Sequence, residues 1–111
     1  MKVYNKLVRD KIPTIIKEDG RKCTLRILEN EEYRQELNTK LKEEVNEYIT
    51  DNNVEELADI VEVIYGILDS MEVSREEFEK IRMQKVEKRG AFKEKIFLID
   101  AEEKETMKFD K

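Results

Sequence analysis

The sequence predicts an all-α fold, an antiparallel helical bundle of about four helices, and it allows for one short two-stranded β element. Charged residues make up 44% of the chain and hydrophobic residues 39%, with only 3 Gly and 1 Pro, which is typical of long helices with exposed ion pairs. Apolar residues also recur at helical spacing through the middle of the chain. A length of 111 residues is enough for one domain with a modest core.

The N-terminal part of the chain predicts one short helix and one extended segment. The helix runs from Asp10, its N-cap, to about Glu18, and Pro13 is tolerated in its first turn. Side chains alternate in character over residues 22–28, and this period of two favours a short strand whose partner would be residues 95–99. The apolar members of the alternation are Cys23, Leu25 and Ile27.

Two long helices are predicted in the centre of the chain. The first covers residues 31–49 and has Asn30 as its N-cap, and the polar run 51–53 then predicts a tight turn. The second covers residues 54–70 and folds back antiparallel on the first. The apolar residues at helical spacing are Tyr33, Leu37, Leu41, Val45, Tyr48 and Ile49 in the first helix and Val54, Leu57, Ala58, Val61, Ile64 and Leu68 in the second.

The C-terminal part predicts one further helix and a tail. Ser74 and Glu77 have the spacing of a capping box, and Gly90 stands where a helix that begins there would end. We therefore expect one domain over residues 1–100 and a solvated C-terminal tail over residues 101–111.

Four acidic side chains fall where the long helices should be apolar. Glu44 lies in the arc of the inward-facing residues of the first helix, and Glu47 lies at the edge of that arc. Asp59 interrupts an apolar run in the second helix and shares its stripe with Glu56. A fold at Asn52 places the two pairs opposite each other in register, so the four carboxylates converge on one small volume.

Converging carboxylates are destabilising unless protons or cations neutralise them. Ligands that offer only oxygen select hard cations, chiefly Mg²⁺, with Mn²⁺ as the other candidate. The plainer alternative is a set of solvated acids that pair with Lys40 or Lys42. We prefer this alternative for Glu43, Glu55 and Glu62, although any of these could support the site from a neighbouring position.

The acidic residues also resemble a known signature. Glu43-Glu44-x-x-Glu47 on one helix and Glu56-x-x-Asp59 on the next resemble the EExxE…ExxD pattern of the all-α nucleotide pyrophosphohydrolases, a superfamily that includes MazG and phosphoribosyl-ATP pyrophosphohydrolase. The runs YNKLVRDKIP at residues 4–13 and KVEKRGAF at residues 85–92 are similar to the two ends of a phosphoribosyl-ATP pyrophosphohydrolase-like subgroup. The gap between the two acidic motifs is shorter than expected for MazG, which bears on the substrate more than on the site.

The resemblance implies an Mg²⁺-dependent enzyme that hydrolyses a nucleoside triphosphate between the α- and β-phosphates, giving a monophosphate and pyrophosphate. A phosphoribosyl nucleotide is the alternative substrate. The implied metal ligands are Glu44, Glu47, Glu56 and Asp59, and the implied catalytic residues are Glu43, Glu44 and Glu47, with Glu43 or Glu47 orienting the attacking water. Positive side chains must complete such a site, and the candidates for substrate binding are Lys85, Arg89, Lys6 and Arg9.

Composition excludes several other classes. A net charge of −5 and a sequence pI near 5.0 argue against stable nucleic-acid binding. The chain has no His, and Cys23 is its one cysteine, which excludes disulfide frameworks, cysteine/histidine zinc sites and histidine-based catalysis. No apolar run approaches the roughly 20 residues of a membrane span, and the first nine residues do not resemble a signal peptide, so we expect a cytoplasmic protein that does not bind membranes.

The second long helix is apolar on more than one side, which predicts a homodimer or homotetramer. The other expected partner is the nucleotide substrate. Two further functional interpretations stay open at this point. One is a non-catalytic helical oligomer or nucleotide-sensing regulatory module on the same scaffold, and the other is a metal-binding module without turnover.

Overall fold

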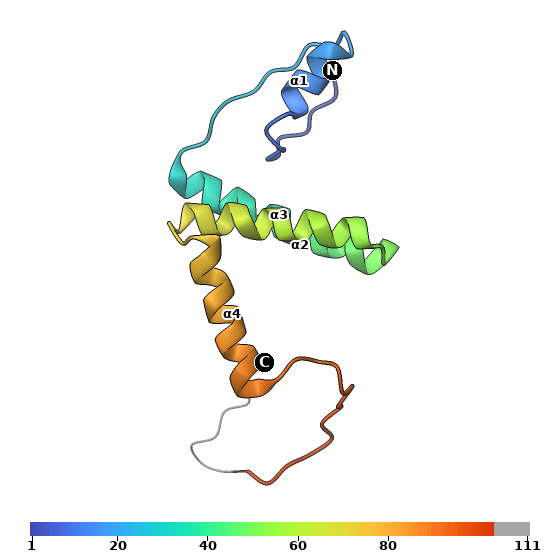
Figure 1. The fold of residues 1–111 in the computed structure, drawn as a ribbon. Coiled ribbons are helices and arrows are strands. Elements are labelled where there is room, and N and C mark those ends of the chain that lie inside the picture. The colour runs from blue at the N-terminus through green and yellow to red at the C-terminus, as the bar shows by residue number, and fades with distance from the viewer. Residues whose placement is uncertain (104–111) are drawn as a thin grey trace. The chain divides into compact units, whose positions relative to one another are not determined.

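The computed structural model describes residues 1–103, and these residues form four α-helices and no strand. The helices are α1 (Ile12–Glu18), α2 (Asn30–Asp51), α3 (Val54–Ser70) and α4 (Arg75–Arg89), as Figure 1 shows. The chain divides into two compact units, Met1–Glu79 and the part from Lys80 onward, with the boundary inside α4. The all-α prediction is confirmed for the described residues.

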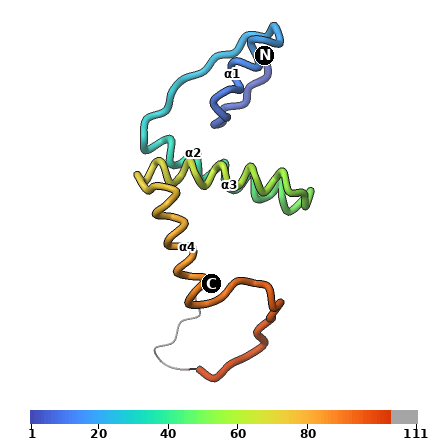
Figure 2. Tube along the Cα trace, in the orientation of Figure 1, coloured from blue at the N-terminus to red at the C-terminus, as the bar shows by residue number. Residues whose placement is uncertain are grey.

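The helices α2 and α3 form an antiparallel hairpin, as the sequence predicted, and they run side by side in Figures 1 and 2. Asn52 takes the left-handed conformation at φ 52° and ends α2, while its N–H donates to the Tyr48 carbonyl at 2.7 Å. Asn53 is the N-cap of α3, and its side-chain oxygen accepts a hydrogen bond from the Glu56 N–H at 3.0 Å. Asn52 therefore ends α2 and Asn53 begins α3, so these two residues alone form the turn.

The core of the hairpin is small. Leu37 of α2 and Val63 and Leu68 of α3 are the buried apolar side chains of residues 1–103. Gly66 faces Leu37, and a Cβ atom at this glycine would lie 3.0 Å from Leu37 Cδ2 and 3.6 Å from the Tyr33 hydroxyl. The missing side chain lets the two helices pack closely at this end of the hairpin.

The predicted ends of α1 and α2 need correction. Asp10 was expected to cap α1, but the N-cap is Lys11, because a turn with an Ile12 N–H to Arg9 carbonyl hydrogen bond precedes the helix. Asn30 was expected to cap α2, but it lies inside the helix. The N-cap is Glu29, with an extended backbone at ψ 164° and no side-chain capping bond.

The C-terminal helix follows the prediction closely. The Ser74 hydroxyl accepts the Glu77 N–H at 3.1 Å, as expected for the start of α4. Gly90 has φ 82° and its N–H donates to the Val86 carbonyl at 2.7 Å, which ends the helix. Residues 101–103 of the predicted tail are exposed and carry no helix or strand, and the rest of that tail lies outside the described residues.

The predicted β element is not formed in residues 1–103. Residues 22–28 and 95–99 have no strand hydrogen bonding. Ile27 in the first segment and Phe97 in the second are each 88% exposed. Alternation describes a strand's two faces without supplying a partner, and a pair of short strands alone is at best marginally stable. None of the helices in the described part of the chain has the length and apolar character needed to cross a bilayer.

Candidate metal centre

Glu44 is the one charged residue among the buried residues of the described chain. It is 7% exposed, as Leu68 of the core is. It lies seven residues after Leu37, so helical spacing carries it along the packed face of α2. Its Oε2 atom is shielded from solvent and has no hydrogen-bond partner. A buried carboxylate oxygen without a partner is strongly unfavourable unless a proton or cation neutralises it.

Glu44 belongs to two groups of converging carboxylates. In the first group, Glu43, Glu44 and Glu47 of α2 each place one oxygen within 4.8 Å of the others. In the second, Glu44 meets Glu56 and Asp59 of α3 within the same limit. The predicted register is therefore correct, because acids from both helices meet across the hairpin with Glu44 at the point they share.

The capping of α3 positions the acids on that helix. Because Asn53 holds the Glu56 N–H, Glu56 is fixed in the first turn of α3, and Asp59 follows three residues later on the same face. Glu56 Oε2 is also shielded from solvent and without a hydrogen-bond partner. Both helices thus direct one unpartnered oxygen into the centre.

The electrostatics of the centre oppose the charged form of two acids. Burial raises the pKa of Glu44 above its ordinary value, and the negative charge of Glu47 raises it further. Burial also raises the pKa of Glu56, again with the charge of Glu47 as the next cause. A divalent cation in the same place would reverse both effects, since it favours the ionised carboxylates.

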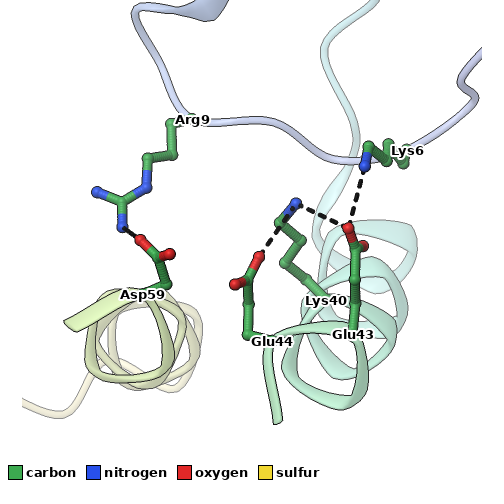
Figure 3. A network of polar contacts seen from close by, with 6 residues as sticks. All are labelled: Lys6, Arg9, Lys40, Glu43, Glu44 and Asp59. Atoms are coloured by element: carbon green, nitrogen blue, oxygen red, sulfur yellow. Dashed lines mark hydrogen bonds and ion pairs between the residues drawn. The ribbon is translucent and has the colours of Figure 1, made fainter. Parts of the chain in front are cut away.

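Three cations contact Glu43, Glu44 and Asp59 of the centre. Figure 3 shows them as Lys6, Arg9 and Lys40. Lys6 Nζ lies 3.0 Å from Glu43 Oε1, and an Arg9 guanidinium nitrogen lies 2.6 Å from Asp59 Oδ1. The hydrogen bond from Lys6 holds the pKa of Glu43 below its ordinary value, and the same bond raises the pKa of Lys6. These contacts put two of the four predicted substrate-binding residues directly beside the acids.

Lys40 is the third cation, and the sequence predicts for it only an ordinary ion pair with the neighbouring acids. Its Nζ lies 3.7 Å from Glu43 Oε1 and 3.6 Å from Glu44 Oε1, and its side chain is only 18% exposed. The i,i+4 spacing to Glu44 was the available signal. Lys85 and Arg89, the other two predicted substrate-binding residues, belong to the second compact unit of the chain.

A separate surface depression lies beside the start of α2. Its lining mixes both charges, and Arg26 is bound there by both oxygens of Glu32, at 3.0 and 2.6 Å. Arg26 and Glu32 neutralise each other, and Glu29 and Glu31 are exposed to solvent, so none of these acids has a buried, unpartnered oxygen like Glu44 Oε2. The full lining is Arg26, Ile27, Glu29, Glu31, Glu32 and Gln35.

The acidic centre fits a divalent cation that prefers oxygen. Oxygens on opposite sides of Mg²⁺ are about 4.2 Å apart and those around Ca²⁺ about 4.6–5.2 Å apart, so a spacing within 4.8 Å suits either with small side-chain movements. The five carboxylates offer neither nitrogen nor sulfur, which disfavours softer metals. No protein-family model, curated protein or solved structure matches this chain.

Proposed function

We propose that this protein is an Mg²⁺-dependent nucleotide pyrophosphohydrolase of the all-α type, which cleaves a nucleoside triphosphate between the α- and β-phosphates. The observation that carries the proposal is the buried Glu44, with an unpartnered oxygen at the meeting point of two carboxylate groups. A purely structural helix gains nothing from such a residue. The resemblance of the acidic motifs to the pyrophosphohydrolase signature supplies the choice of substrate.

The acids would bind the metal ion and activate the attacking water, and Glu47 takes part in both roles. Glu44, Glu47, Glu56 and Asp59 would hold Mg²⁺ or Mn²⁺, which supplies Lewis-acid activation of the phosphoryl group and of the attacking water. Glu43 is paired with Lys6 and with Lys40, and both lower its pKa, so it stays ionised and is a weak proton acceptor. Glu47 is exposed at the edge of the centre, and we assign to it the orientation and deprotonation of the water.

Substrate charge would be balanced by the cations beside the acids. Arg9 presents a planar guanidinium that can bind two phosphate oxygens at once. Its side chain is 55% exposed, and that of Lys6 is 42% exposed, so both can reach a ligand from solvent. Lys40 approaches from within α2 and would add charge near the leaving pyrophosphate. We also propose that the protein acts in the cytoplasm.

Pyrophosphate release from a panel of ribo- and deoxynucleoside triphosphates with Mg²⁺ tests the proposal. Glu44→Gln and Asp59→Asn should each lower kcat/KM by about two orders of magnitude or more, because a lost metal ligand removes several kcal/mol of transition-state stabilisation. Glu62→Gln is the matched control, since Glu62 is an exposed acid of α3 outside both carboxylate groups. Glu47→Gln should reduce kcat more than Glu43→Gln.

Other results would select other functions. Release from a phosphoribosyl nucleotide alone would change the substrate and leave the centre in place. Mg²⁺ binding without release from any nucleotide would indicate a metal-binding or nucleotide-sensing module. Neither binding nor release would indicate a non-catalytic helical scaffold.

We also propose that the protein assembles as a homodimer or homotetramer through α3. Val54, Leu57 and Val61 leave a stripe of α3 between 42% and 76% exposed, and the buried core of the described chain is small. Light scattering after gel filtration should give a multiple of 13.3 kDa, and Val61→Lys should reduce it to one chain. A single chain at micromolar concentration would reject the assembly without affecting the metal centre.

A further inference from the structure

One short segment spans the two helices of the acidic centre. Residues 6–10, which we name the N-terminal strap, reach α2 through Lys6 and Glu43 and reach α3 through Arg9 and Asp59, as Figure 3 shows. The paired residues are 37 and 50 positions apart in the sequence. The strap therefore lies directly over the carboxylates, and its two cations each form an ion pair with one oxygen, of Glu43 and of Asp59.

The charges of the centre do not balance when all groups are ionised. Five carboxylates carry five negative charges, and Lys6, Arg9 and Lys40 carry three positive charges. Two negative charges remain, which is the charge of one divalent cation. Without the two strap cations four negative charges would remain, which is the charge of two divalent cations. The five acids are Glu43, Glu44, Glu47, Glu56 and Asp59.

We propose that the N-terminal strap is a removable counter-ion that limits the metal centre to one divalent cation until phosphate oxygens draw Lys6 and Arg9 away. This inference rests on the metal-binding part of the proposed function. Strap release frees the oxygens of Glu43 and Asp59 and admits a second cation. The nucleotide-bound protein would therefore hold two cations, and the nucleotide-free protein would hold one.

The exposure of the three cations agrees with a strap that leaves while Lys40 stays in place. Arg9 and Lys6 are 55% and 42% exposed, and ion pairs that are this exposed are weak and exchange readily. Lys40 is 18% exposed and is part of the same helix as its partners, so it stays when the strap leaves. Glu44 is nine-tenths buried below the strap, and its unpartnered Oε2 atom gives the first cation its binding position.

Titration with Mn²⁺ alone, followed by the electron paramagnetic resonance signal of the free ion, counts the bound cations. Wild-type protein should bind one Mn²⁺ per chain and Lys6→Gln/Arg9→Gln two. The first Mn²⁺ should bind the double variant about twofold to thirtyfold more tightly than it binds wild type, which is the range that the loss of two exposed ion pairs allows. Arg21→Gln is the matched control, because it breaks an exposed pair with Asp19, also in the N-terminal region, and should behave as wild type.

The outcomes separate the strap from the metal centre. Equal stoichiometry and affinity in wild type and double variant would overturn the inference and leave the centre standing. Weaker binding by the double variant would also overturn it, since the strap would then be holding the ligands in place. No Mn²⁺ binding by either protein would remove the metal centre itself. If circular dichroism shows that the double variant does not fold, Arg9→Gln alone should still bind Mn²⁺ more tightly.

Discussion

Replacing Glu44 by Gln should make the metal-free protein more stable and at the same time abolish its response to Mg²⁺. The side chain keeps its shape, but the buried negative charge at the centre of two carboxylate groups is removed. A residue that destabilises the empty protein and stabilises the metal-bound protein is expected for a ligand. A merely structural glutamate would not give opposite signs under the two conditions.

The size of the effect follows from the distances. Two unit charges 4.8 Å apart repel by about 0.9 kcal/mol in water and about 3.5 kcal/mol at an effective dielectric constant of 20. Lys6 and Arg9 neutralise two of the neighbouring acids, and Lys40, at 3.6 Å from Glu44, offsets part of the remainder. We therefore expect a gain of about 1 kcal/mol for Glu44→Gln in EDTA, which corresponds to a rise in Tm of about 4–8 °C.

The assay compares thermal unfolding in EDTA and in Mg²⁺ for wild type, Glu44→Gln and the control Glu62→Gln. At a concentration of 100 times Kd, Mg²⁺ should stabilise wild type by about 2.7 kcal/mol and Glu44→Gln hardly at all, so the order of the two Tm values inverts. The control should follow wild type in both buffers. Two outcomes would contradict a metal ligand at this position. One is a Glu44→Gln protein that is less stable than wild type in EDTA, and the other is an Mg²⁺ shift of its Tm as large as that of wild type.

Three smaller predictions concern pH, the strap and the turn. The pKa of Glu44 is raised in the folded protein, so protonation of this residue stabilises the fold. The gain in unfolding free energy from Glu44→Gln in EDTA should therefore vanish below about pH 4.3 and grow as pH rises through the raised pKa. Urea unfolding from pH 4 to 8 measures this gain. Lys6→Gln should cost less than about 1 kcal/mol at pH 7, and this cost should decline as pH falls through the lowered pKa of Glu43, because the pairing stabilises only the ionised carboxylate. Urea unfolding over a falling pH series checks this, and a cost that does not change with pH would contradict it. Asn53→Ala should cost about 1 kcal/mol in urea unfolding, and Asn53→Ser should restore most of it; equal stability of the two variants would contradict a capping role.

The hairpin and its acids could be predicted because each depends on local spacing. Helical periodicity places Glu44 among inward-facing residues, and the three polar residues of the turn fix the register that brings Asp59 opposite. Burial of an acid among apolar neighbours is itself unusual enough to mark a site. The hairpin and the position of its acids can therefore be predicted without knowledge of any distant contact.

The counter-ions could be named only as candidates. Lys6 and Arg9 are two of 22 basic residues, and long flexible side chains leave no periodic trace of their partners 37 and 50 positions away. Capping rules failed at Asn30 for a different reason, since they describe which side chains can cap but not where the backbone leaves the helix. The alternation at residues 22–28 likewise describes a strand's faces without providing its neighbour.

The turn at Asn52 and Asn53 has a consequence for how such a chain can change. With Asn53 kept as the N-cap, one residue inserted between it and Glu56 would turn Glu56 and Asp59 by about 100° about the axis of α3 and carry them away from Glu44. An insertion in the extended segment between α1 and α2 would leave the same three carboxylates in place. Length variation among descendants of this sequence should therefore be tolerated before α2, and between α2 and α3 only where the facing register of the acids is restored. That register is then a better guide to a retained carboxylate cluster than the identity of the surrounding residues.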